Sequence, residues 1–122
     1  MKHIQTLTLS IICIALMGCA ALKPGNDPVV VRAEQTVKVA FEVCDSFLQW
    51  EHMNRAAVPP EIQTYATALR ESGPPAFKTA RTLTKAYKQN RSDENRANLD
   101  TALAVLIALQ SESAAYITAL TR

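Results

Sequence analysis

The chain is poor in the residues that mark special architectures. Among its 122 residues there are only three glycines, three cysteines and two histidines, and 13 basic residues nearly balance 11 acidic ones. Three glycines and six prolines are too few for a collagen-like or low-complexity chain. The formal net charge of +2 excludes a protein that binds nucleic acid through charge alone. A single domain is predicted, because a second hydrophobic core would need roughly 100 more residues.

Residues that build catalytic sites are equally scarce. Apart from His3 near the N-terminus, His52 is the only histidine. Cys44 and His52 are eight residues apart. On a straight helix that places them about 12 Å apart along the axis, too far to pair or to share a metal. Since Cys-x-x-Cys, His-rich and Gly-rich phosphate motifs are also missing, the sequence predicts a protein that is not an enzyme and holds no metal or cofactor.

The first 18 residues have the pattern of a secretory signal peptide. Lys2 and His3 precede an apolar stretch from Ile4 to Leu16, which a few polar residues interrupt. This stretch is too short to span a bilayer, which takes about 20 apolar residues. It suits the hydrophobic region of a signal peptide instead, and it ends in Leu16-Met17-Gly18-Cys19.

This tetrapeptide resembles the lipobox of bacterial lipoproteins. The resemblance implies cleavage between Gly18 and Cys19, a covalent lipid such as palmitate on the Cys19 thiol, and a mature chain that begins at Cys19. Ala20, in place of Asp, implies sorting to the outer membrane of the cell envelope, facing the periplasm. The alternative is an ordinary secreted protein in which Cys19 is a free thiol. Residues 19–28, which include Pro24 and Pro28, are expected to tether the lipid to a helical domain over 29–122.

Hydrophobic periodicity predicts that this domain is all-α. Two long helices are expected over 29–54 and 93–120, and two shorter ones over 60–72 and 75–89. Gly73, Pro74 and Pro75 are expected to separate the short helices, and Ser92 is expected to cap the last one. The predicted fold is a small helical bundle in which the two long helices are covered by the short pair. Its predicted core comprises Val30, Ala33, Val37, Ala40, Cys44, Phe47, Ile62, Tyr65, Ala66, Leu69, Ala76, Phe77, Ala80, Leu83, Thr84, Tyr87, Leu99, Ala102, Leu103, Leu106, Leu109, Ser113, Tyr116, Ile117 and Leu120. Phe41 and Leu48 are expected to widen the stripe of the first helix.

One helix face is predicted to carry uneven charge. Lys78, Arg81, Lys85 and Lys88 recur at spacings of three and four, and no acidic residue lies between Glu71 and Asp93. This basic face is a candidate contact for something anionic, such as lipid head groups or an acidic partner. A solvated face, or one paired with acidic residues of the first helix, is the alternative.

Two further features allow two interpretations each. Cys44 is either a small core residue or a thiol that forms an intermolecular disulfide. Trp50 and Met53 either close the end of the bundle or form an exposed binding patch.

Three functions remain open. The first is a non-enzymatic periplasmic lipoprotein, held on the membrane by its lipid, which binds a protein partner or supports the envelope; a homo-oligomer is also allowed. Val31-Arg32-Ala33-Glu34-Gln35 and the helical remainder resemble uncharacterised small lipoproteins of bacteria and prophages. That resemblance implies the second function, a prophage-encoded envelope protein that acts in lysis or superinfection exclusion. The third is a small envelope hydrolase, which would need His52.

Overall fold

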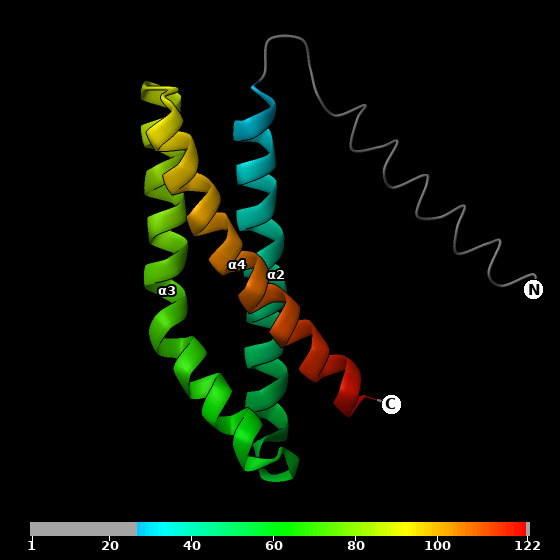
Figure 1. Ribbon diagram of the computed structural model, residues 1–122. Coiled ribbons are helices and arrows are strands. Elements are labelled where there is room, and N and C mark those ends of the chain that lie inside the picture. The colour runs from blue at the N-terminus through cyan, green and yellow to red at the C-terminus, as the bar shows by residue number, and fades with distance from the viewer. Residues whose placement is uncertain (1–26, 122) are drawn as a thin grey trace, which may run out of the picture.

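The computed structural model describes residues 27–121. They form three α-helices, α2 (Pro28–Asn54), α3 (Pro60–Gln89) and α4 (Asp93–Leu120), and a 3-10 turn (Arg55–Ala57). There is no strand within this range. The helices α2 and α4 run in the same direction and α3 runs in the opposite one (Figure 1). The prediction of a small all-α bundle is therefore confirmed.

Side-chain caps explain where two of the helices begin. The Asp27 carboxylate accepts a hydrogen bond from the backbone N–H of Val29 at 2.9 Å, and Pro28 fits the first turn because its missing N–H needs no partner there. The Ser92 hydroxyl accepts from the backbone N–H of Asn95 at 3.1 Å, as predicted. The predicted bounds 29–54 and 93–120 are correct to within one residue.

The predicted break at Gly73, Pro74 and Pro75 is wrong, because α3 continues through all three residues. The two short helices expected over 60–72 and 75–89 are therefore one, and the bundle has three long helices. The prolines leave the carbonyls of Arg70 and Glu71 without helical donors, but both of these residues are exposed, so water can reach them. The helix bends instead of ending (Figure 1), as expected where prolines interrupt the hydrogen-bond ladder.

The core lies along the line where the three helices meet. The six residues of the central α2 stripe are all buried, together with Leu69, Phe77, Leu99 and Leu106 from the other two helices. Of the two residues expected to widen that stripe, Leu48 is partly buried, whereas Phe41 is 49% exposed. Alanines at the helix contacts, namely Ala33, Ala40, Ala66 and Ala80, are fully buried. Because alanine is small, the helix backbones can approach closely at these points.

The helix α4 lies across the other two helices (Figure 1) and packs on both. By length and composition it is also able to cross a membrane, with a mean hydropathy of 1.5 in its most apolar window. Only 17% of that window is buried in the bundle. Leu103 and Leu106 account for part of this hydropathy, because they point into the core.

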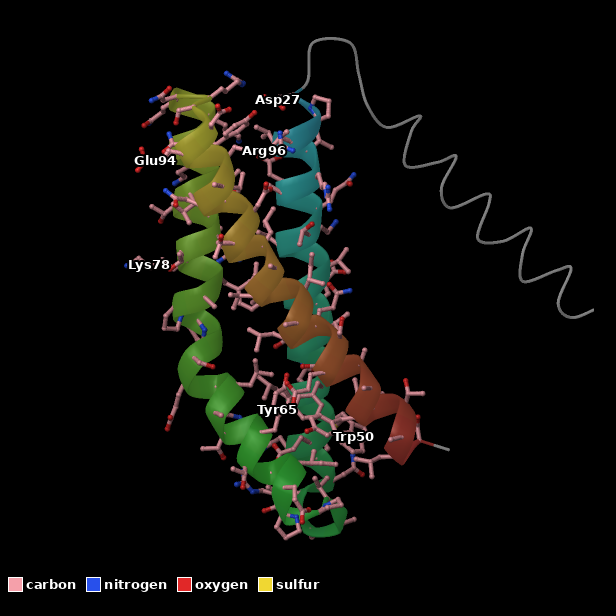
Figure 2. The ribbon with its side chains drawn as sticks, viewed as in Figure 1. Asp27, Trp50, Tyr65, Lys78, Glu94 and Arg96 are labelled. Carbon is pink, nitrogen blue, oxygen red and sulfur yellow. The ribbon has the colours of Figure 1, made fainter. Side chains whose placement is uncertain are left out.

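Aromatic side chains close the end of the bundle that lies farther from Asp27. The Phe47 ring centroid lies 5.3 Å from that of Tyr65 and 6.4 Å from that of Trp50. Figure 2 shows Tyr65 and Trp50 in this region. Trp50 is thus half-buried against the core, whereas Met53 is 76% exposed. The end-closing interpretation holds for Trp50, and Met53 remains outside the cluster.

A candidate binding groove between α2 and α3

The lipid-attachment and cleavage residues predicted from the sequence, Cys19 and Gly18, lie outside the described residues, as do the rest of the lipobox and Ala20. The candidate site within residues 27–121 is a groove lined only by residues of α2 and α3. It consists of two adjoining hollows, which share Phe41 and Arg81. We call the two together the α2–α3 groove.

The apolar hollow has a volume of about 370 Å³. Its apolar lining is formed by Phe41, Cys44, Leu48, Leu69, Gly73, Pro74 and Phe77. Gly73 leaves space here, since a Cβ atom at this position would meet only the Leu69 Cδ1 atom, at 3.6 Å, among neighbouring residues. Because Gly73 has no side chain, the hollow is deeper beside the bend of α3.

Two aromatic rings and one cation mark the junction of the hollows. The Phe41 and Phe77 rings meet edge to face, with centroids 5.6 Å apart, yet Phe41 remains 49% exposed. The Arg81 guanidinium lies over the Phe77 ring, 5.9 Å from its centroid. This contact holds a positive charge beside the apolar surface.

The charged hollow has a volume of about 560 Å³ and extends toward the Asp27 end of the bundle. Its charged residues are Glu34, Lys38, Glu42, Arg81, Lys85 and Lys88. Glu34 and Lys88 form an ion pair across the groove at 2.5 Å. The other residues include three cations and one carboxylate, and none of these four forms an ion pair with a described residue.

The structure divides the predicted basic face. Arg81 and Lys85 line the groove, and Lys88 lines it while pairing with Glu34. Lys78 lines neither hollow, and Figure 2 shows it on the outer side of α3, away from α2 and α4. The alternative of a face paired with the first helix therefore applies to Lys88 alone among the four.

Beside the apolar hollow lies a buried carboxylate that the sequence analysis did not identify as a core group. Glu51 is fully buried, and its Oε2 accepts a hydrogen bond from Arg70 Nη2 at 2.6 Å. Its Oε1 has no hydrogen-bond partner and lies 3.8 Å from Arg55 Nη1. The sequence did indicate that Glu51 is buried, because the spacing of the α2 stripe from Val30 to Phe47 places its next position at Glu51.

Cys44 is 4% exposed, which agrees with the core interpretation. The Ser113 hydroxyl donates to its Sγ at 3.8 Å, and the Tyr65 hydroxyl lies 2.9 Å from the same Ser113 oxygen. Burial raises the pKa of the Cys44 thiol, and the Ser113 hydrogen bond opposes this only in part. Burial likewise raises the pKa of Tyr65. A protonated thiol is a poor nucleophile, so this cluster suits a structural role.

His52 lies on the exposed surface near the end of α2. Within residues 27–121, no group of three or more His, Cys, Asp or Glu side chains is placed to hold a metal ion. The groove could not be predicted from the sequence, because it depends on which residues of α2 face α3. Comparison with known proteins found no family model, no curated protein and no solved structure that matches the chain.

Proposed function

We propose that the chain is a non-enzymatic lipoprotein of the cell envelope, which is anchored by a lipid on Cys19 and binds a partner along the α2–α3 groove. The observation that carries the anchor is Leu16-Met17-Gly18-Cys19, which directly follows an apolar stretch. With Ala20 in the next position, the proposed location is the periplasmic face of the outer membrane.

The groove supports a binding role for the domain. Ligand sites in proteins are concave and mostly apolar, with a few polar groups, and commonly measure about 300–1,000 Å³. The apolar hollow fits this description, and Arg81 supplies a polar group at its edge. A nucleophilic mechanism, by contrast, would need a base within hydrogen-bond reach of a serine or cysteine. The Ser113 hydroxyl contacts the Cys44 thiol and the Tyr65 hydroxyl instead.

The anchor is tested by labelling cells with a palmitate analogue and isolating the protein. We expect the label on the wild-type protein and its loss in Cys19→Ser. Cys13→Ser is the matched control, because Cys13 lies in the segment that cleavage removes. We also expect the wild-type protein in the outer-membrane fraction.

Three outcomes would contradict the proposed anchor. They are retention of the label in Cys19→Ser, a mature protein that still carries residues 1–18, and release of the wild-type protein into the soluble periplasmic fraction. The sorting part is tested separately by Ala20→Asp, which we expect to move the protein to the inner membrane without loss of the label.

A further inference from the structure

We propose that the α2–α3 groove binds a single-chain anionic lipid, with the acyl chain in the apolar hollow and the head group at Arg81, Lys38 and Lys85. The proposal deepens the proposed function, since it names the ligand class of the groove. It rests on the arrangement of the two hollows, which share Phe41 and Arg81. A ligand with an apolar part joined directly to a charged part would match both hollows.

The charges of the groove favour an anion. Lys88 is neutralised by Glu34 at 2.5 Å, and Arg70 is occupied by Glu51 at 2.6 Å. In the charged hollow this leaves Lys38, Arg81 and Lys85 against the single carboxylate of Glu42. The excess positive charge is complementary to a phosphate or carboxylate head group, although Asp45 lies on the rim of the apolar hollow.

The apolar hollow suits one acyl chain better than a bulky side chain. Its apolar lining extends along α2 from Phe41 to Leu48, and along α3 from Leu69 to Phe77. These spans correspond to about 10–12 Å on each helix, so the apolar lining is elongated along both helices. Half of the Phe41 side chain is exposed there, and an acyl chain that covered it would remove apolar surface from water.

The proposed anchor keeps the groove within reach of membrane lipids. Asp27 follows Cys19 by eight positions, and a chain of that length spans at most about 30 Å. The charged hollow lies at the Asp27 end of α2, since it begins at Glu34. Tethering of this kind raises the local concentration of lipid at the groove without any new contact.

The test uses the full chain, purified in dodecyl maltoside micelles with its anchor in place. The probe is lysophosphatidylglycerol with a photoreactive acyl chain, and lysophosphatidylcholine with the same chain is the zwitterionic comparison. After irradiation, cross-linked peptides are identified by mass spectrometry. We expect cross-links in 41–48 and 69–77, and about tenfold stronger labelling by the anionic lipid, the ratio expected of one charge-assisted contact.

Matched variants separate the groove from the rest of the surface. Arg81→Glu should weaken labelling about tenfold, while Lys78→Glu, on the outer side of α3, should leave it unchanged. Phe41→Gln should also weaken labelling, whereas Val39→Gln should not. Val39 is 45% exposed, close to the exposure of Phe41, but lines neither hollow. Circular dichroism checks that each variant is folded.

Three results would overturn the lipid proposal. They are equal labelling by the two lipids, cross-links that map to α4 rather than to the groove, and equal effects of Arg81→Glu and Lys78→Glu. In cells, a photoreactive amino acid in place of Glu42, which lines the charged hollow but is not a proposed lipid contact, would also overturn it if it cross-linked to a protein and not to lipid. Palmitate on Cys19 is measured independently, by the labelling experiment described for the anchor. Groove labelling that persists in Cys19→Ser would support this proposal even if the anchor failed, and an acylated protein with an unlabelled groove would contradict this proposal alone.

Discussion

Arg70 Nη2 lies 2.6 Å from Oε2 of Glu51, a carboxylate that is fully buried between α2 and α3. The Arg70 side chain is 35% exposed, so it reaches from the protein surface to the buried Glu51 carboxylate. This pair connects the two helices next to the apolar hollow. A buried carboxylate is tolerated only while it keeps a partner, because its desolvation is otherwise uncompensated.

We predict that Arg70→Ala lowers the free energy of unfolding by about 2–3 kcal/mol, since Glu51 would lose its partner. The value is lower than for a fully buried pair, because water already reaches Arg70. Arg55→Ala is the matched control; its Nη1 lies 3.8 Å from Glu51 Oε1 and its side chain is 51% exposed, so a loss under about 1 kcal/mol is expected. Urea denaturation followed by circular dichroism measures both. Equal losses would contradict a special role for Arg70.

The Tyr65 hydroxyl should stabilise the contact between α3 and α4. It donates to the Leu109 carbonyl at 3.1 Å and contacts the Ser113 hydroxyl at 2.9 Å. We expect Tyr65→Phe to cost about 1 kcal/mol of unfolding free energy, the value of one such hydrogen bond. Tyr116→Phe should cost less than about 0.5 kcal/mol, because the Tyr116 hydroxyl reaches only the exposed Glu112 carboxylate, at 3.3 Å. The same denaturation experiment compares them, and a larger loss for Tyr116→Phe would refute this ordering.

Asp27 should make stability depend on pH in acid. Its Oδ2 accepts a hydrogen bond from Arg91 Nε at 2.6 Å, and this contact lowers the pKa of Asp27. Because the folded pKa lies below the unfolded one, the stabilisation is present above the ordinary pKa of an aspartate and is lost as pH falls through the lowered pKa. The melting temperature of Asp27→Asn should therefore lie below that of the wild type at about pH 5, and the difference should shrink toward about pH 2.

Arg91→Gln is the partner control for this prediction, because it removes the same ion pair from the other side. We expect the melting temperature of Arg91→Gln, like that of Asp27→Asn, to depend less on pH than that of the wild type. The hydrogen bond from the Val29 N–H to the Asp27 carboxylate remains in this variant. If the difference between wild type and Asp27→Asn stayed constant over this pH range, the ion pair with Arg91 would not be its source, because asparagine also caps a helix.

Cys44 should react slowly with thiol reagents in the folded protein. It is 4% exposed, and burial raises the pKa of its thiol. In a Cys13→Ser/Cys19→Ser chain it is the one remaining cysteine. We expect Ellman's reagent to modify it only at the rate at which the bundle opens, and rapidly in urea. A disulfide-linked dimer on a non-reducing gel of the native protein would instead favour the intermolecular interpretation.

The sequence was sufficient to predict the regular parts of the fold. In α2 and α4 an apolar stripe, a side-chain cap and the absence of internal glycine and proline all agree, so their bounds are nearly correct. In α3 two signals conflict. Gly73, Pro74 and Pro75 favour the end of a helix, whereas the apolar stripe continues from Leu69 to Phe77. The outcome depends on whether the packing of that stripe outweighs two lost hydrogen bonds whose carbonyls face water. The balance between packing and lost hydrogen bonds depends on the neighbouring helices, so it cannot be judged from the sequence of α3 alone.

The candidate site was less predictable for a related reason. The spacing of Lys78, Arg81, Lys85 and Lys88 places them near one another on α3, but only the packing of α3 on α2 decides which of them faces Glu34 and which faces solvent. Glu51 could have been found by extending the stripe of α2 by one step. Its partner Arg70 could not, because the register between two helices is a property of the whole bundle.

The continuity of α3 also determines where the ends of the described chain lie. A bundle of four alternating helices would bring its first and last residues to the same end, whereas here Asp27 and Leu120 lie at opposite ends (Figure 1). In a protein anchored ahead of Asp27, α4 therefore leads away from the lipid over roughly 40 Å. The domain would act as a rigid spacer, and a tension applied between its two ends would pull along the bundle's length rather than peel the helices apart.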